Sequence, residues 1–219
     1  MVGNDIVDLL DPESRPESLH PRFDTRVFSE AERAAIAACE SPNRERWRLW
    51  AAKEAAYKLV RKSAPTTVFS PVRFEVSFHE SVPGALREGK VSHGDSEIAV
   101  RAEESQTWVH VIALGSHKRD LVARVAPLDP AEAAKGDPDA PSHAVRALVC
   151  EAMAAPLGVH HTALEVRRTG RVPHLYCNGE LAPADLSLSH HGGYVAFAAA
   201  LLPSSGPLRP GAPSLGAVG

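Results

Sequence analysis

Residues 47–58 of the chain read Trp-Arg-Leu-Trp-Ala-Ala-Lys-Glu-Ala-Ala-Tyr-Lys. This stretch consists of residues that favour helices and contains no Gly or Pro, so it predicts a helix from about Arg44 to Lys62. An apolar stripe marks the face that we expect to pack on the core: Leu49, Ala52, Ala56, Leu59 and Val60. The helical period gathers a second column on the other face: Trp47, Trp50, Glu54, Lys58 and Arg61.

Glu54 and Lys58 lie one helical turn apart, and this spacing has two interpretations. The two residues form either a catalytic pair or an ordinary ion pair on a solvated helix, worth only a few tenths of a kcal/mol. The neighbouring Trp47 and Trp50 argue against free solvation, because large aromatic side chains seldom lie on a fully wet face. The rest of the sequence has to decide between the two interpretations.

Composition indicates a globular protein without a strong electrostatic partner. The 219 residues are 44% hydrophobic, and 24 basic against 27 acidic residues give a net charge of −3, which argues against a nucleic-acid or membrane partner held by bulk charge. Three widely spaced cysteines, Cys39, Cys150 and Cys177, argue against a disulfide framework and a zinc site. The N-terminus lacks the features of a signal peptide, and no window is apolar enough to span a membrane. We therefore expect a cytoplasmic location.

Upstream of the predicted helix, residues 2–10 read as a short buried strand that places Asp5 and Asp8 near its end. A carboxylate in an apolar strand is costly unless it is paired, hydrogen-bonded or bound to a metal, although Asp5 also suits a turn or a helix cap. Residues 11–25 read as a loop. Ser29 and Glu32 have the spacing of a capping box, which predicts a helix that ends near Cys39.

Downstream of Ala64-Pro65 the apolar period changes from 3.6 to 2. We expect strands at 72–78, 97–101 and 107–114, with turns at Gly84, Gly89 and Gly94. A helix capped by Ser142 and ended by Pro156 and Gly158 follows a Pro-rich segment. Further strands are expected at 164–168 and 173–177, and residues 185–201 read as a strand, a Gly-Gly turn and a strand.

A helix followed by an antiparallel sheet thus occurs twice, which predicts an α+β fold of two similar halves related by a pseudo-two-fold axis. The expected divisions are a first half with the metal and catalytic motifs (1–125), a linker (126–141), a second half (142–203) and a disordered tail (204–219). Ligand sites favour the interface between such units.

Three motifs carry chemistry: the acidic strand Gly3–Asp8, the helical segment Lys53–Lys58, and Ser187–Gly193, which reads Ser-Leu-Ser-His-His-Gly-Gly. Two carboxylates from separate elements suit a Mg²⁺ ion that retains several waters. Serine, histidine and a Gly-Gly turn suit a phosphate group. Each motif is weak alone, and their joint occurrence is far more specific.

Together these motifs resemble those of the 4'-phosphopantetheinyl transferase superfamily. Its patterns G-x-D-[IV]-[EV]-x, [WF]-x-x-K-E-[AS]-x-x-K and S-[LIV]-S-H are matched by Gly3–Asp8, Trp50–Lys58 and Ser187–His190. Residues 26–32 also resemble the R-[VF]-[LF]-[ST]-x-x-E segment between the first two. Val7 departs from the longer type, which has a second acidic residue there, and the Ser-His segment comes last instead of first. A fused pseudo-dimer explains this order and implies a monomer; the alternative is a short-type chain with an inserted sheet that trimerises.

The resemblance implies Mg²⁺-dependent transfer of the 4'-phosphopantetheine arm from coenzyme A to a serine of an apo acyl or peptidyl carrier protein, releasing adenosine 3',5'-bisphosphate. It implies that Asp5 and Glu54, with Asp8 as a helper, ligate Mg²⁺, that Glu54 is the base, and that Lys58 binds the diphosphate. By the same analogy, the 3'-phosphate and adenine end of coenzyme A would be held by His190, Ser189 and Arg171.

Two other functions fit the motifs less well. A non-catalytic module that binds coenzyme A or a carrier protein would be free to lose Asp5, Glu54 and Lys58, and all three are present. A Mg²⁺-dependent hydrolase of a nucleotide diphosphate would leave carrier proteins unmodified. Two groups of arginines have the charge to face an acidic carrier helix or to form a solvated basic surface: Arg15, Arg22 and Arg26, and Arg44, Arg46 and Arg48.

Overall fold

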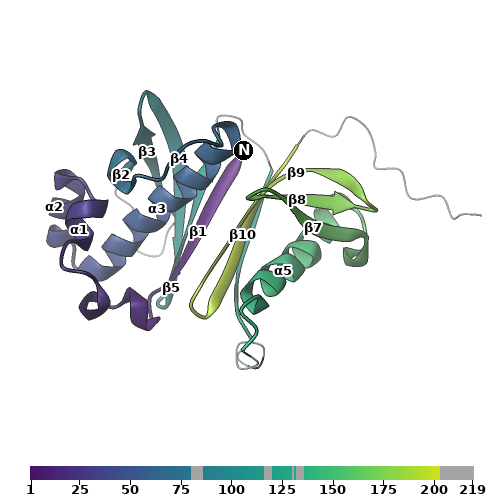
Figure 1. Ribbon diagram of the computed structural model, residues 1–219, viewed down its shortest axis with the longest axis horizontal. Coiled ribbons are helices and arrows are strands. Elements are labelled where there is room, and N and C mark those ends of the chain that lie inside the picture. Colours follow the sequence, from purple (N-terminus) through teal and green to yellow (C-terminus); the bar gives the residue numbers. More distant parts are fainter. Residues whose placement is uncertain (80–85, 116–119, 130, 132–135, 203–219) are drawn as a thin grey trace, which may run out of the picture.

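The computed structural model describes residues 1–79, 86–115, 120–129, 131 and 136–202. Two antiparallel five-stranded sheets lie side by side, and one long helix covers the outer face of each (Figure 1). This arrangement confirms the predicted α+β fold of two halves.

The first sheet has the order β1-β5-β4-β3-β2 and contains β1 (Val2–Asp8), β2 (Glu75–Phe78), β3 (Arg87–His93), β4 (Ser96–Glu104) and β5 (Trp108–Leu114). The second has the order β6-β10-β9-β8-β7 and contains β6 (Leu121–Pro127), β7 (Leu164–Thr169), β8 (Val172–Cys177), β9 (Glu180–His191) and β10 (Tyr194–Leu201). The helices are α1 (Phe23–Val27), α2 (Glu30–Ala38), α3 (Pro42–Ser63) and α5 (Ala140–Leu157), with 3₁₀ turns at Pro12–Ser14, Pro16–Ser18, Pro71–Arg73 and His161–Ala163. None of the helices in this described part has the length and hydrophobicity needed to cross a bilayer.

The helix α3 is the predicted central helix, and its apolar stripe packs on the first sheet. Leu49, Ala52, Ala56 and Leu59 are buried against that sheet. Trp47 and Trp50 pack on Phe23 of α1, with ring centroids 5.8 and 5.7 Å apart. Both tryptophans therefore belong to the core of the first half, and that is why they occur on the second face of α3.

Gly3 allows α3 to lie directly on β1. A Cβ atom at this position would come within 2.0 Å of the carbonyl oxygen of Ala55 and 2.9 Å of the backbone nitrogen of Leu59. Backbone atoms cannot move aside as a flexible side chain can, so only glycine permits this approach. The glycine of the first motif thus has a packing role.

The capping box of α2 is present and connects to a buried ion pair. Ser29 Oγ accepts from the N–H of Glu32 (3.3 Å), and Glu32 Oε2 accepts from the N–H of Ser29 (2.8 Å). Glu32 also binds the fully buried Lys53 at 2.8 Å. Burial lowers the pKa of Lys53, and Glu32 opposes that shift. Lys53, the first lysine of the helical motif, therefore holds α2 against α3.

Two local predictions are wrong. Gly89 lies inside β3, paired with Phe78, and is not a turn, because its missing side chain lets the two strands approach closely. The N-cap of α5 is Asp139, and the helix starts before Ser142 because Pro141 suits the first helical turn.

The predicted boundary at residue 125 falls inside β6, whose pairing with β10 puts it in the second sheet. We therefore propose that the second half begins at Leu121. Gly84 and the tail 204–219 lie outside the described residues.

The two halves meet along β1, an edge strand of the first sheet. Side chains of β9 cover this edge and accept three backbone N–H groups: Val2 to Asp185 Oδ2 (2.5 Å), Asn4 to Ser187 Oγ (2.9 Å) and Asp8 to His191 Nδ1 (3.1 Å). Each pair is 183 positions apart, so β9 follows β1 in one register. The edge is thus protected from pairing with another chain.

Candidate active site

β1 and α3 bring three of the predicted residues together. Lys58 Nζ donates to Asp5 Oδ1 at 2.7 Å and to the carbonyl oxygen of Asn4 at 3.0 Å. Glu54 lies one turn before Lys58 on the same helix, and the negative charge of Asp5 raises its pKa. The ion pair of Lys58 therefore runs to β1, which argues against the simple solvated helix pair with Glu54.

Burial and charge change the acidity of Glu54. Burial, followed by the negative charge of Asp5, raises the pKa of Glu54 from 4.5 to about 7, and the nearby Lys58 partly offsets the rise. A carboxylate with this pKa can accept a proton near neutral pH, as a general base must. We therefore propose Glu54 as the base of this cluster.

The carboxylates of Asp5 and Glu54 fit a Mg²⁺ ion. They are partly buried, come from different elements, and lie close enough for Asp5 to disfavour ionisation of Glu54. A divalent cation would relieve this repulsion, and magnesium prefers such oxygen ligands while retaining several waters. The donor set thus suits the ion that the sequence predicts.

Asp8 does not join Asp5. Successive side chains of a strand point to opposite faces, so residues three apart diverge. Asp5 faces α3, whereas the carboxylate of Asp8 accepts from the N–H groups of Leu10 and Gly193, both at 2.9 Å. Asp8 holds the hairpin turn between β9 and β10, and the structure does not support its predicted role as a metal helper.

His190 brings the second half to the cluster. It is exposed near the end of β9, and its pKa is lowered first by partial burial and then by Lys58, Arg168 and the neighbouring His191, while Asp5 opposes the shift. Charges from both halves therefore act on His190. We therefore propose a composite site where β1 and α3 meet the second sheet.

Ser189 and Arg171, the other two residues predicted to bind coenzyme A, differ from His190 in their burial and position. Ser189 is buried, and its hydroxyl accepts from Asn4 Nδ2 at 2.8 Å. Arg171 is exposed on the turn between β7 and β8, and no contact among the described residues joins it to the cluster. Arg168, which the sequence argument missed, acts on His190 from β7. Its only sequence signal is its position beside the Gly-Arg-Val-Pro segment.

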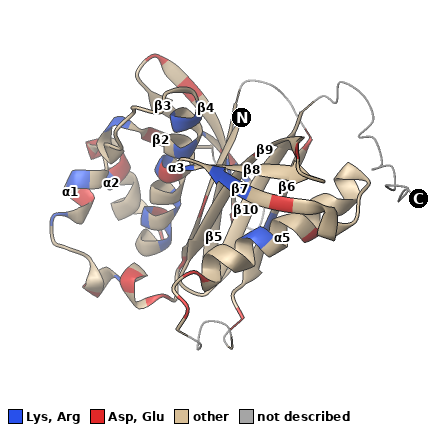
Figure 2. Ribbon diagram, turned by 45° about the vertical axis from the view of Figure 1, so that its right-hand side comes forward, with Lys and Arg blue, Asp and Glu red and all other residues tan. Residues whose placement is uncertain are grey.

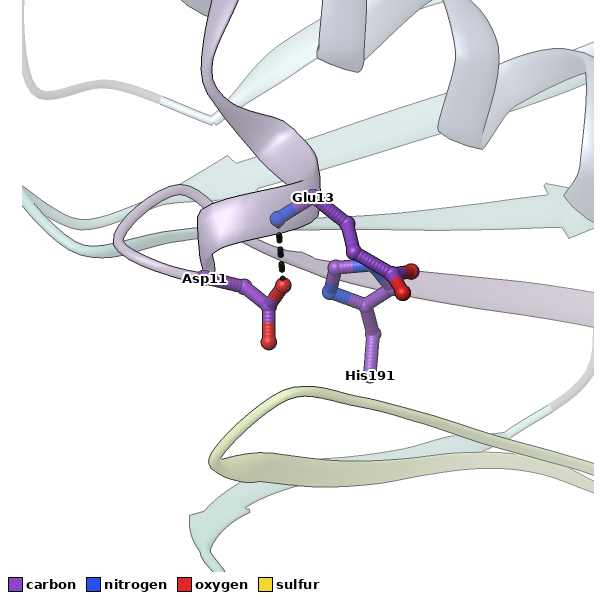
Figure 3. Close-up of side chains that lie close together, drawn as sticks. All are labelled: Asp11, Glu13 and His191. Carbon is purple, nitrogen blue, oxygen red and sulfur yellow. Dashed lines mark hydrogen bonds between the residues drawn. The ribbon is translucent and has the colours of Figure 1, made fainter. Parts of the chain in front are cut away.

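A second group of potential metal ligands lies at the far end of β1. The ligand atoms of Asp11, Glu13 and His191 lie within 4.8 Å of one another (Figure 3). His191 Nδ1 already accepts the N–H of Asp8, so in a neutral ring the proton is on Nε2. Nε2 then carries the proton and has no lone pair for a metal. His191 belongs to the Ser-His segment, but no sequence motif indicated its position beside Asp11 and Glu13.

A cavity of about 490 Å³ lies elsewhere, between α2 and β2. Its lining contains Glu32, Glu45 and Arg87 and none of the residues of the composite site. The cavity and the Asp5–Glu54–Lys58 cluster are therefore separate features of the first half.

Comparison with known proteins finds one family. The family model described as ACPS, 4'-phosphopantetheinyl transferase superfamily, matches residues 1–121 of the 219. The matched region includes Asp5, Glu54 and Lys58 and ends where β6 begins. No curated protein matches the chain.

Proposed function

Because the chain belongs to the 4'-phosphopantetheinyl transferase superfamily, we propose that it transfers the 4'-phosphopantetheine arm from coenzyme A to a serine of an apo acyl or peptidyl carrier protein. The second product is adenosine 3',5'-bisphosphate. The observation that carries this proposal is the Asp5–Glu54–Lys58 cluster, in which the pKa of Glu54 is about 7.

Glu54 accepts the proton of the attacking serine hydroxyl. The serine oxygen then bonds to the phosphorus that carries the pantetheine arm, and the bond from that phosphorus to the bridging oxygen breaks. A base with a pKa near the working pH combines a large ionised fraction with useful basicity. Lys58 donates to an oxygen of the diphosphate and stabilises the charge that develops on the leaving phosphate.

Asp5 and Glu54 would hold Mg²⁺. When bound, this ion supplies positive charge that neutralises the diphosphate. Asp8 is not part of this proposed pair, because its carboxylate already accepts the N–H groups of Leu10 and Gly193.

The second half binds the adenosine end of coenzyme A. The lowered pKa of His190 favours a neutral imidazole, which donates one hydrogen bond to the 3'-phosphate. Arg168 supplies positive charge beside it, and Arg171 lies three residues further along the same hairpin. Ser189, whose hydroxyl is buried, acts indirectly.

The carrier protein docks on the basic surface formed by Arg15, Arg22 and Arg26. These three side chains are exposed and belong to α1 and the segment before it. Figure 2 shows basic positions of the chain in blue at α1. The second arginine group is engaged within the chain: Arg44 with the carbonyl of Gln106 (3.0 Å), Arg46 with Asp24 (2.8 Å) and Arg48 with Glu104 (2.7 Å). Among the residues that the structure describes, the first group has no such partner, so its charge is available to an acidic helix. Both halves of the site come from one chain, so the protein acts as a monomer.

Mass spectrometry tests this proposal. Apo acyl and apo peptidyl carrier proteins are each incubated with the protein, coenzyme A and Mg²⁺, and a gain of one phosphopantetheine arm on either is expected. Glu54→Gln should abolish the gain while leaving the circular dichroism spectrum unchanged. Tight binding of coenzyme A without modification would instead support a binding module, and cleavage of coenzyme A without modification would support a hydrolase.

A further inference from the structure

Asn4 contacts both parts of the composite site. Its carbonyl oxygen accepts from Lys58 Nζ at 3.0 Å. Its side-chain Nδ2 donates to Ser189 Oγ at 2.8 Å, and its backbone N–H donates to Ser187 Oγ at 2.9 Å. Asn4 is completely buried, so water does not compete for these bonds. One residue thus joins the lysine of the first half to the strand that carries His190.

The two serine contacts fix where His190 lies along β1. Ser187 and Ser189 point from the same face of β9, and His190 follows directly on the other face. A slip of β9 by two residues would move His190 by about 7 Å and would break both contacts. The pair of hydrogen bonds therefore selects one position of His190 relative to Lys58.

His110 fixes the orientation of the Asn4 amide. Asn4 Nδ2 lies 3.0 Å from His110 Nε2. Burial lowers the pKa of His110 to about 3, so the ring is neutral and Nε2 can accept the second amide proton. Both protons of the Asn4 amide are then used, one toward β5 and one toward β9.

The hydrogen-bond network around Asn4 leaves buried polar atoms unsatisfied, and this lowers stability in a way that a purely structural contact would avoid. Asn4 Oδ1 and His110 Nδ1 are buried and have no hydrogen-bond partner among the described residues. An unsatisfied buried polar atom costs stability that an apolar residue of similar shape would avoid. A role in the site explains why an asparagine stands here.

We propose that Asn4 is a positioning residue that sets the spacing between Lys58 and His190, and with it the spacing between the diphosphate and 3'-phosphate subsites for one coenzyme A molecule. The inference rests on the proposed function. It predicts that Asn4 controls the preference for coenzyme A over dephospho-coenzyme A, which lacks the 3'-phosphate.

Isothermal titration calorimetry with the full chain tests the inference without requiring transfer. The quantity measured is the ratio of the Kd for dephospho-coenzyme A to the Kd for coenzyme A. Asn4→Ala should lower this ratio at least about fivefold, as His190→Ala should, and the double variant should show no further loss because both act on one contact. Ser189→Ala removes only the hydroxyl that accepts from the Asn4 amide, and it should also lower the ratio. This variant replaces Asn4→Ala in the test if Asn4→Ala fails to fold.

Thr107→Val is the matched control. It removes another hydrogen bond between the halves, the one between Thr107 Oγ1 and the hydroxyl of Tyr194 (2.8 Å), and should leave the ratio unchanged even if the Tm falls. An unchanged ratio in both Asn4→Ala and Ser189→Ala overturns the inference, as does a wild-type ratio near one. Carrier modification is followed separately by mass spectrometry and decides the proposed function. If the carrier is modified but the variants leave the Kd ratio unchanged, the inference about Asn4 fails and the transferase stands. If the variants lower the Kd ratio but the carrier is never modified, the transferase fails and the inference about Asn4 stands.

Discussion

Substituting Glu54 tests the electrostatic description of the site through stability. The pKa of Glu54 rises from 4.5 to about 7 on folding. Each pKa unit corresponds to about 1.4 kcal/mol, so ionised Glu54 disfavours the folded state by about 3 kcal/mol relative to the protonated form. Between these two pKa values the folded chain holds a proton that the unfolded chain has lost, so stability falls as pH rises. Glu54→Gln removes this dependence.

Urea unfolding in the absence of divalent cations measures the effect. The free energies of unfolding of the wild type and Glu54→Gln are compared at about pH 4, where Glu54 is protonated in both states, and at about pH 8, where it is ionised in both. The advantage of the variant over the wild type should grow by about 3 kcal/mol across this range. Titrating groups that do not interact with Glu54 are shared and cancel in the difference. Adding Mg²⁺ at the higher pH should stabilise the wild type more than the variant, because the ion would bind ionised Glu54.

Glu151→Gln provides the control, because Glu151 is an exposed glutamate on α5 in the other half. The same comparison for this variant gives the pH response of removing a glutamate outside the cluster. If the difference for Glu54→Gln grows no more with pH than that of the control, Glu54 is neither desolvated nor facing Asp5, and the reasoning that makes it the base fails.

Three further changes probe separate features. Gly3→Ala places a methyl group against the carbonyl of Ala55 and should lower the free energy of unfolding by about 1–3 kcal/mol in chemical denaturation. Lys53→Met leaves buried Glu32 without its cation and should cost about 3–5 kcal/mol, and adding Glu32→Gln should recover part of this loss. Arg26→Glu should raise the KM for the apo carrier protein while leaving the KM for coenzyme A unchanged, and an effect that persists at high salt would contradict the docking surface.

Local patterns predicted most of the fold. The apolar stripe of α3, the capping box at Ser29 and the Gly-Gly hairpin depend on neighbouring residues, and the structure contains all three. β3 and β6 were missed for two different reasons. Gly89 interrupts the alternation of β3, although this strand pairs with its neighbour β4 across a short turn. β6 precedes a Pro-rich segment and pairs with β10, far along the chain. Long-range pairing of this kind has no local signal.

The sequence predicted the residues of the candidate site that belong to its motifs, but it did not predict the contacts made between the two sheets. Asp5, Glu54 and Lys58 come together as the sequence suggested. The separation of Asp8 from Asp5 follows from strand alternation and could have been inferred from the sequence. The burial of Ser189 and the approach of Arg168 to His190 could not, because both depend on how the second sheet lies against β1.

β1 explains why three consecutive residues of the first motif have three different tasks. A helix turns its neighbours by 100° and presents one broad face, whereas a strand points successive side chains in opposite directions. Gly3 and Asp5 therefore face α3, one for close packing and one for charge, while Asn4 between them faces β9. Only a strand at the junction of two sheets can serve both sides within so short a segment. A substitution at Asn4 should accordingly disturb coenzyme A recognition by the second half while leaving the ion pair of Asp5 with Lys58 in place.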